Sequence, residues 1–504
     1  MRDGPSRRWI LGRVLRSGLL RPRALFALAA AMRASGTSLV ALTRFGGAQA
    51  GAMLVGEDER VALRDLADQA DRLAVVLQQE HGIQRGQPVG ILGANSVALV
   101  RCLLAASRLG ARTILLNPHL PADRIGPLLD RHAVAFVLAP GGATDVPLPG
   151  GCTVCDPTDL LRMPLRVGIR LRRRGSGEIV VLTGGTTGLP KAANRAASPP
   201  GVTRLFLHLI AALPLEQSCS VHVAVPLFHG FGLSALLIAM TLGRTIHLRQ
   251  RFDAAEAAAL IVSEGIDTIV VVPTMLQRLL NVTAGELPLR CVVTGGAPLA
   301  STLANATRDR FGEILFNLYG TSEAGLSALA TPRDLASVPD TIGRPVWGAE
   351  IAVRGADGAP IASGEVGELH VRNRASIAPR DWIATGDRAS RDRGGRMFLH
   401  GRVDDMIVSG GENVAPSDVE LVLLTHPDVA DAVAVGVADA EYGQRLLAFV
   451  VPCADRVLDA DDLLAWLTPR VARHQRPRRL VIRAALPLTA IGKVDRRALV
   501  REGS

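Results

Sequence analysis

The sequence contains only two lysine residues, Lys191 and Lys493, and both are candidates for chemistry. Lys and Arg together number 57 in the 504 residues, so the other 55 are Arg, and the formal net charge is +10. A guanidinium serves as well as an ammonium on a solvated surface, but it cannot replace a compact ammonium on a flexible stem. The alternative is that both lysines are ordinary surface residues. The sequence around each lysine decides between these interpretations.

Lys191 closes a glycine-rich segment that directly follows an apolar run at 179–182. The segment 183–191 has the sequence TGGTTGLPK. Its Gly residues let backbone N–H groups approach an anion, its Thr residues add hydroxyl donors, and Lys191 adds positive charge. A Walker A loop differs, because its Lys directly follows Gly and precedes Ser or Thr. The pattern predicts a phosphate-binding loop of another kind.

This loop resembles the phosphate loop of the adenylate-forming superfamily, which includes acyl-CoA synthetases, peptide-synthetase adenylation domains and luciferases. Further segments resemble motifs of that superfamily and follow in the same order. They are VPTML at 272–276, GGAPL at 295–299, YGTSE at 319–323, TGD at 385–387, GRVDD at 401–405, SGGEN at 409–413 and IGK at 491–493. The resemblance runs from about residue 61 to the end of the sequence. It is closest to bacterial medium- and long-chain fatty acyl-CoA synthetases.

The resemblance implies a nucleotide site with ATP and Mg²⁺. Tyr319 offers an aromatic face for adenine, and Asp387 accepts hydrogen bonds from the ribose hydroxyls. Glu323 is a hard oxygen ligand that suits Mg²⁺ on the triphosphate. The other residues that the resemblance assigns to this site are Thr183, Gly185, Thr186, Thr187, Gly188, Gly295, Gly296, Ala297, Gly320, Thr321, Ser322 and Arg402.

The resemblance also implies catalytic residues. Lys191 would bind the leaving pyrophosphate, and Lys493 would bridge the acyl carboxylate and the α-phosphate, two anions that repel each other. His229, in PLFHG at 226–230, matches a motif near the acyl carboxylate, with a buried structural histidine as the alternative. Gly410 and Gly411 match a motif used in the thioester step with coenzyme A.

The sequence departs from the family pattern at three places. Gly184 stands where the phosphate loop usually has Ser, and Ala192 stands where Gly is common. The stretch between Val371 and Thr385 is shorter than usual and lacks a Gly-Tyr element. Because Asp387 and Glu323 are retained, an active enzyme remains the favoured interpretation.

The elements that must position these residues follow from hydrophobic periodicity. Apolar residues recur at helical spacing from residue 61 to 78, and the short apolar runs that follow are typical of buried strands. These runs are at 89–92, 113–116, 134–138, 179–182, 221–225, 268–272 and 290–293. Alternating strands and helices predict an α/β fold with parallel-rich sheets and helices on both faces.

After about residue 342 the sequence pattern changes to short stretches of alternating apolar and polar residues separated by Gly turns. This pattern predicts a small β-barrel-like part. A small, mobile α+β domain is expected after residue 402, with helices near 416–424 and 459–471 and strands at 433–437 and 446–451. We therefore divide the chain into a basic N-terminal extension (1–45), a large adenylate-forming domain (46–402) and a small C-terminal domain (403–504) with the hinge and Lys493.

The composition limits the cellular location and the binding partners that we expect for the protein. The uncharged stretch 217–243 contains Pro, Gly and His and is expected to be a strand, a loop and a helix, so we expect neither a transmembrane helix nor a cleaved signal peptide. A cytoplasmic protein is expected. The basic N-terminal extension either rests on anionic lipid, as a peripheral membrane contact, or packs on the main domain. Dispersed Arg and few aromatic residues argue against a nucleic-acid partner.

The resemblance implies a fatty acid–CoA ligase, an acid–thiol ligase that forms acyl-AMP from a carboxylic acid and ATP and then transfers the acyl group to coenzyme A. Two alternatives remain open. One is an acyl-AMP ligase that loads a carrier protein, although such enzymes usually carry an insertion that is missing here. The other is a degenerate nucleotide- or acyl-binding homologue.

Overall fold

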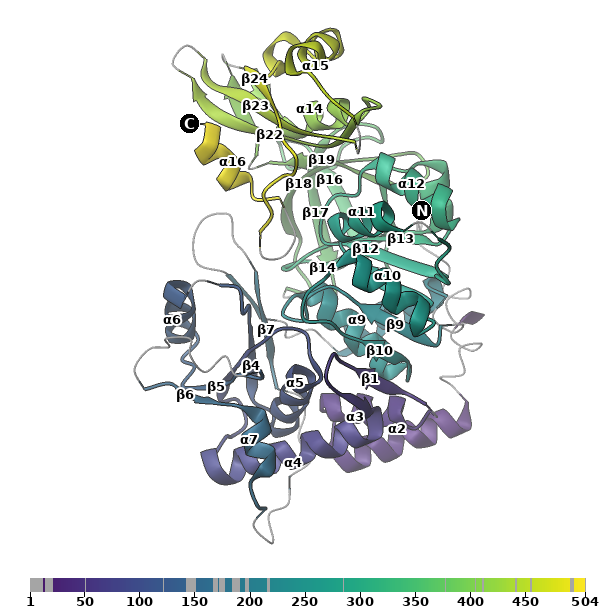
Figure 1. The fold of residues 1–504 in the computed structure, drawn as a ribbon, viewed down its shortest axis with the longest axis vertical. Helices are drawn as coiled ribbons and strands as arrows, with labels where there is room; N and C mark the ends of the chain where they lie inside the picture. The colour runs from purple at the N-terminus through teal and green to yellow at the C-terminus, as the bar shows by residue number, and fades with distance from the viewer. Residues whose placement is uncertain are drawn as a thin grey trace. The chain divides into compact units, whose positions relative to one another are not determined.

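The protein is described from a computed structural model, in which the described residues form two compact units (Figure 1). The N-terminal unit comprises residues 5–296 with 374–379, and the C-terminal unit comprises 297–373 with 380–504. The structure describes residues 12–13, 21–49, 51–120, 122–141, 151–165, 171, 177–183, 191–194, 199–214, 218–283, 285–376, 378–403, 405–409, 412–439, 442–453, 456–489 and 494–503.

The N-terminal unit contains a six-stranded sheet in the order β6, β5, β3, β4, β7, β8. Its pairs are parallel except β7 with β8. The central strands are buried along almost their whole length, as expected where helices cover both faces. The strands are β3 (Pro88–Leu92), β4 (Arg112–Leu116), β5 (Phe136–Leu138), β6 (Thr153–Cys155), β7 (Ile179–Thr183) and β8 (Lys191–Asn194).

Six further strands of this unit pair in the order β12, β11, β9, β10, β1, β2, and only β1 and β2 are antiparallel. The strands are β1 (Met53–Val55), β2 (Arg60–Ala62), β9 (Ser220–Val223), β10 (Thr245–His247), β11 (Thr268–Val271) and β12 (Cys291–Gly295). The helices of the unit are α2 (Pro22–Ser35), α3 (Leu39–Gly47), α4 (Leu63–His81), α5 (Val97–Leu109), α6 (Ala122–Arg131), α7 (Pro157–Arg162), α8 (Pro199–Ala212), α9 (Gly230–Thr241), α10 (Ala254–Ser263) and α11 (Pro273–Val282).

The C-terminal unit begins with antiparallel strands in the order β16, β17, β18, β19, β15, β14, β13. They enclose an apolar cluster that includes Tyr319, Ile342, Leu369 and Met397. The strands are β13 (Leu315–Thr321), β14 (Gly325–Ala330), β15 (Thr341–Pro345), β16 (Ala349–Arg354), β17 (Gly367–Asn373), β18 (Ile383–Arg391) and β19 (Met397–Arg402), and the helices are α12 (Ser301–Phe311) and α13 (Pro332–Ser337).

The rest of this unit is an α+β part around the long hairpin of β22 and β23 (Figure 1). Its sheet has the order β21, β20, β23, β22, with β24 parallel to β23. Its elements are β20 (Ile407–Ser409), β21 (Glu412–Val414), α14 (Pro416–Leu423), β22 (Val429–Asp439), β23 (Gly443–Pro452), α15 (Ala460–Leu467), the 3₁₀ turns Thr468–Arg470 and Arg473–Gln475, β24 (Arg479–Ile482) and α16 (Arg496–Gly503).

The predicted α/β fold is confirmed, and most element boundaries shift by only one to three residues. The helix expected from residue 61 begins at Leu63, because 60–62 pair with β1 as β2. The strand expected at 134–138 begins at Phe136, because Ala133 has a positive φ of 52° after α6. The uncharged stretch folds as β9, a loop and α9.

Two findings bear on domains and membranes. The boundary predicted at residues 402–403 falls inside the C-terminal unit, where Ser417 Oγ donates to the His400 carbonyl oxygen at 2.9 Å. The division of the chain into domains and the mobility of the last hundred residues therefore stay predictions. Among the helices that the structure describes, none is both long and apolar enough to cross a bilayer.

Three of the buried histidines that the structure describes in the N-terminal unit have a strongly lowered pKa, and each is expected to be neutral at pH 7. They are His208 in α8, His222 in β9 and His247 in β10, and burial lowers the pKa of each to about 4. Nδ1 of His222 donates to the carbonyl oxygen of His247 at 3.1 Å. Burial in α8 or in parallel strands with covered faces leaves these imidazoles in a poor environment for positive charge.

We expect this unit to lose stability as the pH falls from about 6.5 towards 4. Unfolded histidines gain protons near their ordinary pKa of ~6.5, whereas the folded ones stay neutral down to about 4, so their contribution is present above 6.5 and lost below it. A depression of the pKa from ~6.5 to about 4 corresponds to roughly 3–4 kcal/mol for each histidine once it is fully expressed. Urea midpoints measured from pH 8 to pH 5 check this expectation. His222→Leu should reduce the dependence of the urea midpoint on pH. The control His119→Leu, which changes an exposed histidine, should leave that dependence unchanged. The same pH dependence in His222→Leu and the wild type would contradict the expectation.

Candidate active site

The structure brings Tyr319 and Asp387 together. Tyr319 lies on β13 inside an apolar cluster, and its hydroxyl donates to Oδ2 of Asp387 on β18 at 2.5 Å. Burial, followed by the neighbouring carboxylate, raises the pKa of Tyr319 above its ordinary value, so the phenol stays a hydrogen-bond donor. Thr385 accepts from the Asp387 amide at 3.2 Å and donates to the Leu369 carbonyl, which fixes the turn before the carboxylate.

Arg402 completes this cluster from β19. Asp387 and Arg402 are register partners of the antiparallel pair, and Nη1 of Arg402 lies 3.2 Å from Oδ1 of Asp387. Gly386 has a φ of +72°, and a Cβ there would lie 2.8 Å from Nη2 of Arg402. Only glycine suits this position without strain or displacement of the guanidinium. Three residues assigned from separate motifs therefore form one cluster.

Glu323 lies in the tight turn between β13 and β14. The register shifts between Tyr319 and Gly320, and a Cβ on Gly320 would lie 2.5 Å from the Gly325 carbonyl oxygen. The hydroxyl of Thr321 accepts from the Ala324 amide at 3.0 Å. The motif at 319–323 is thus a bulged hairpin that presents half-buried Thr321, Ser322 and Glu323 at its tip.

The donor set at this tip fits Mg²⁺ bound mainly through a nucleotide. No group of three or more His, Cys, Asp or Glu side chains that could hold a metal lies among the described residues. Mg²⁺ is commonly held by one or two carboxylates together with substrate phosphates and water, so a single Glu323 is a sufficient protein anchor.

The predicted phosphate loop connects two paired strands in the N-terminal unit. β7 and β8 are antiparallel, and Thr183 pairs with Lys191 at their shared end. Gly185, Thr186, Thr187 and Gly188 lie outside the described residues. β8 is a strand that sequence reasoning missed, because its short KAAN segment has no clear alternation.

His229 is the residue before α9, and its loop is held by a buried asparagine. Asn95 donates from Nδ2 to the Val225 carbonyl at 3.1 Å, and its Oδ1 accepts from the Leu227 amide at 2.7 Å. The His229 ring is tilted against Phe228, with centroids 4.6 Å apart. Sequence reasoning missed Asn95, although a polar residue three positions after the end of buried β3 was a usable signal.

The remaining candidates are placed through their neighbours. Gly295 ends β12 and Gly296 follows with a φ of +80°, and Ala297 is the next residue. Gly410 and Gly411 lie outside the described residues, between the register partners Ser409 and Glu412. Lys493 also lies outside them, and a bridge between Leu488 and Val494 closes the chain around it. The roles of all these residues stay predictions.

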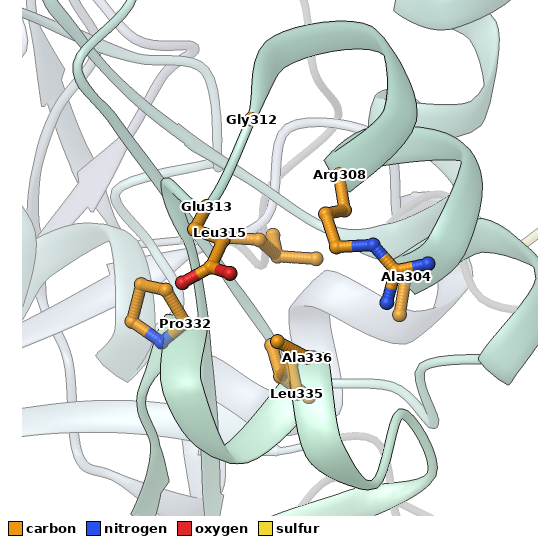
Figure 2. A pocket seen from close by; sticks show the side chains of 8 residues that line it. All are labelled: Ala304, Arg308, Gly312, Glu313, Leu315, Pro332, Leu335 and Ala336. Carbon is orange, nitrogen blue, oxygen red and sulfur yellow. The ribbon is translucent and has the colours of Figure 1, made fainter.

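A small pocket in the C-terminal unit contains none of the candidates. α12, α13 and β13 form it, and Figure 2 shows Arg308 and Glu313 among its lining side chains. The other lining residues are Ala304, Gly312, Leu315, Pro332, Leu335 and Ala336. We therefore place the candidate site at the Tyr319 cluster and its hairpin rather than at this pocket.

Two family models match the chain. The AMP-binding enzyme model matches residues 41–379, and the model for the C-terminal domain of AMP-binding enzymes matches residues 418–493. Among curated proteins, the chain is 30% identical over 480 residues to a 2-succinylbenzoate–CoA ligase of Bacillus pumilus, covering 89% of this chain and 95% of the relative. It is 29% identical to an indoleacetate–CoA ligase of Aromatoleum aromaticum, covering 90% and 95%.

Solved structures agree with the fold. The amide bond synthetase McbA from Marinactinospora thermotolerans matches with a TM-score of 0.80 and 26% identity, covering 92% of this chain and 99% of that one. The o-succinylbenzoate CoA synthetase MenE from Bacillus subtilis, in complex with its acyl-adenylate intermediate, matches with a TM-score of 0.78 and 26% identity, covering 91% and 97%.

Asp387→Asn should raise the KM for ATP at least tenfold, because a neutral amide loses charge-assisted hydrogen bonds worth about 1.5–3 kcal/mol. The control is Asp392→Asn, which removes a carboxylate paired with Arg396 at 2.7 Å between the same two strands. Steady-state kinetics with varied ATP, together with thermal unfolding of both variants, checks the expectation. Equal ATP kinetics in the two variants would limit Asp387 to a structural role.

Proposed function

The chain belongs to the family of AMP-binding enzymes, and from that premise we propose that it joins a carboxylic acid to coenzyme A in two half-reactions. First, an oxygen of the acid attacks the α-phosphorus of ATP, pyrophosphate leaves, and acyl-AMP forms. Then the thiol of coenzyme A attacks the acyl carbon, AMP leaves, and the thiol proton goes to solvent. An acid–thiol ligase of this kind uses ATP, Mg²⁺ and coenzyme A. The observation that carries the proposal is the Tyr319–Asp387–Arg402 cluster beside the Glu323 hairpin.

The described residues supply the nucleotide half of this chemistry. Ribose hydroxyls are donors of the same kind as the Tyr319 hydroxyl, so Asp387 suits them, while Arg402 adds a charged donor to the same carboxylate. Glu323 would hold Mg²⁺, which neutralises charge on the triphosphate when bound. Lys191 and Lys493 are proposed to stabilise pyrophosphate and the meeting of carboxylate with α-phosphate.

We propose an aromatic acid as the substrate in place of the fatty acid expected from the sequence. Support comes from the names of the relatives, which include ligases for 2-succinylbenzoate and indoleacetate and a feruloyl-CoA synthase from an Amycolatopsis species. These names give no support to a medium- or long-chain fatty acid. Asn95 and the His229 loop are proposed to border the acid.

An exposed basic segment supports an anionic acceptor such as coenzyme A. No acidic residue lies between Asp462 and Asp495, whereas residues 470–479 contain five Arg. Within the part of the chain that the structure describes, Arg473, Arg476 and Arg479 are exposed and form no ion pair with a carboxylate. The 3′-phosphate and pyrophosphate of coenzyme A are suitable partners for such guanidinium groups.

The proposal predicts acid-dependent release of pyrophosphate. We expect kcat/KM for at least one of 2-succinylbenzoate, indoleacetate and ferulate to exceed the values for straight-chain acids from acetate to stearate by about tenfold, which corresponds to ~1.4 kcal/mol. Coenzyme A should then release AMP, and 3′-dephospho-coenzyme A should show a higher KM. Pyrophosphate, AMP and thioester are measured separately.

The matched control is Lys493→Ala, which should lose adenylation but keep thioester formation from supplied acyl-AMP. Acyl-AMP that accumulates regardless of coenzyme A would favour a carrier protein or an amine as the acceptor. The absence of pyrophosphate release with every acid would favour the degenerate binder.

We also propose that α2 rests on an anionic membrane surface. One face of α2 packs on α3 through Ala27, Leu28 and Ala31. The outer face exposes Leu25, Phe26 and Met32, with Phe26 76% exposed. No acidic residue lies between Asp3 and Glu57, so the charged residues next to this apolar face along the chain are all cations. Apolar contact and charge attraction act together in such helices.

Vesicles test this contact. The protein should sediment with vesicles of about equal phosphatidylglycerol and phosphatidylcholine, less so at high salt, and Phe26→Ser should reduce the bound fraction severalfold. The control Val457→Ser changes a fully exposed valine elsewhere and should leave sedimentation unchanged. A protein that ignores anionic vesicles, or that forms dimers lost in Phe26→Ser, would contradict a lipid partner.

A further inference from the structure

We propose that Asn373 is a positioning residue that fixes the Glu323 hairpin for Mg²⁺-bound nucleotide. Asn373 is the last residue of β17, and its side chain is almost fully buried at 2% exposure. The inference rests on the proposed function, because it assumes that Glu323 holds the metal. It concerns a residue that none of the motifs contains.

One amide group links two distant parts of the sheet. Nδ2 of Asn373 donates to the carbonyl oxygen of Ala324 at 2.9 Å and to that of Leu326 at 2.7 Å. β17 is not next to β14 in the sheet order, so the contact crosses the curled sheet instead of extending a ladder. The two acceptor carbonyls belong to the residues on either side of Gly325, and the first of these residues, Ala324, directly follows Glu323.

The hairpin tip depends on such an anchor. Its local restraints include the bond between Thr321 Oγ1 and the Ala324 amide, the pairing of Thr321 with Gly325, and the bond that Ser327 Oγ donates to the Gly325 carbonyl. Gly325 has a φ of +68° and offers the turn no side chain. Because Ala324 follows Glu323 directly, a fixed Ala324 carbonyl fixes the backbone from which the Glu323 carboxylate projects.

Asparagine is the residue type that this contact needs. Its NH₂ group carries two donors, so one short side chain can satisfy both carbonyls. Aspartate has the same shape but no donor when ionised, and it would place negative charge against two carbonyl oxygens. Asn373 also lies near the start of the shortened stretch between Val371 and Thr385, so this stretch is anchored to the hairpin close to its first residues.

The test compares metal-bound and metal-free nucleotide. Mn²⁺ replaces Mg²⁺ as the probe, and electron paramagnetic resonance measures its binding in the presence of ATP, while titration calorimetry measures AMP without metal. Asn373→Asp should weaken Mn²⁺ binding with ATP about tenfold and leave AMP binding nearly unchanged. Glu323→Gln should show the same pattern, since both variants act at one metal position.

Thr341→Val is the matched structural control. The buried Thr341 hydroxyl donates to the Met397 carbonyl at 2.9 Å and accepts from the Gly343 amide at 3.0 Å, so its loss also removes two buried hydrogen bonds from this unit. This variant and Asn373→Asp should both lower the unfolding temperature by several degrees. Only Asn373→Asp should weaken the binding of Mn²⁺ in the presence of ATP while leaving AMP binding nearly unchanged.

The outcomes distinguish the metal-binding role of Glu323 from the positioning role of Asn373. If Glu323→Gln binds Mn²⁺ with ATP as the wild type does, the metal role in the proposed function fails and the positioning role fails with it. If Glu323→Gln weakens the metal and Asn373→Asp does not, or weakens AMP equally, only the positioning role is overturned.

Discussion

The carboxylate of Asp387 is the point on which the candidate site depends. A buried tyrosine hydroxyl and a guanidinium both donate to it, and the three side chains come from β13, β18 and β19. Desolvation makes an unpaired carboxylate costly, so these partners stabilise each other as well as the charge. β13 also forms one arm of the hairpin with Glu323, which ties the metal candidate to the ribose candidate.

The three candidate loops, which precede Lys191, contain Gly410 and Gly411, and precede Val494, share one feature. In each, the residues that flank the loop pair with each other as antiparallel β-structure. Thr183 pairs with Lys191, Ser409 with Glu412, and Leu488 with Val494. Antiparallel pairing brings the two ends of a short segment together before any ligand binds, which lowers the entropy cost of ordering glycine-rich chain around an anion. Glycine supplies the close approach, and the stem supplies the position.

Local patterns predicted the fold better than they predicted the site's supporting contacts. Continuous apolar runs identified β3, β4 and β11 because parallel strands are buried on both faces. Resemblance alone named Tyr319, Asp387 and Arg402, and it could not indicate that they touch. Asn95 escaped detection because its partners lie about 130 residues away, where no local period reports a contact. Substrate class also escaped, since motifs describe the nucleotide more than the acid.

The register shift beside Tyr319 has a consequence for insertions and deletions. Tyr319 pairs with Ala328 and Gly320 with Leu326, so Ser327 is the extra residue of β14. Side chains on a strand alternate between two faces, so a count of residues decides which face each one occupies. Removing Ser327 would remove the bulge and its local bend from β14, so the tip that carries Glu323 would be held differently relative to Tyr319, with every motif residue still present. In this hairpin, spacing carries information that residue identity does not.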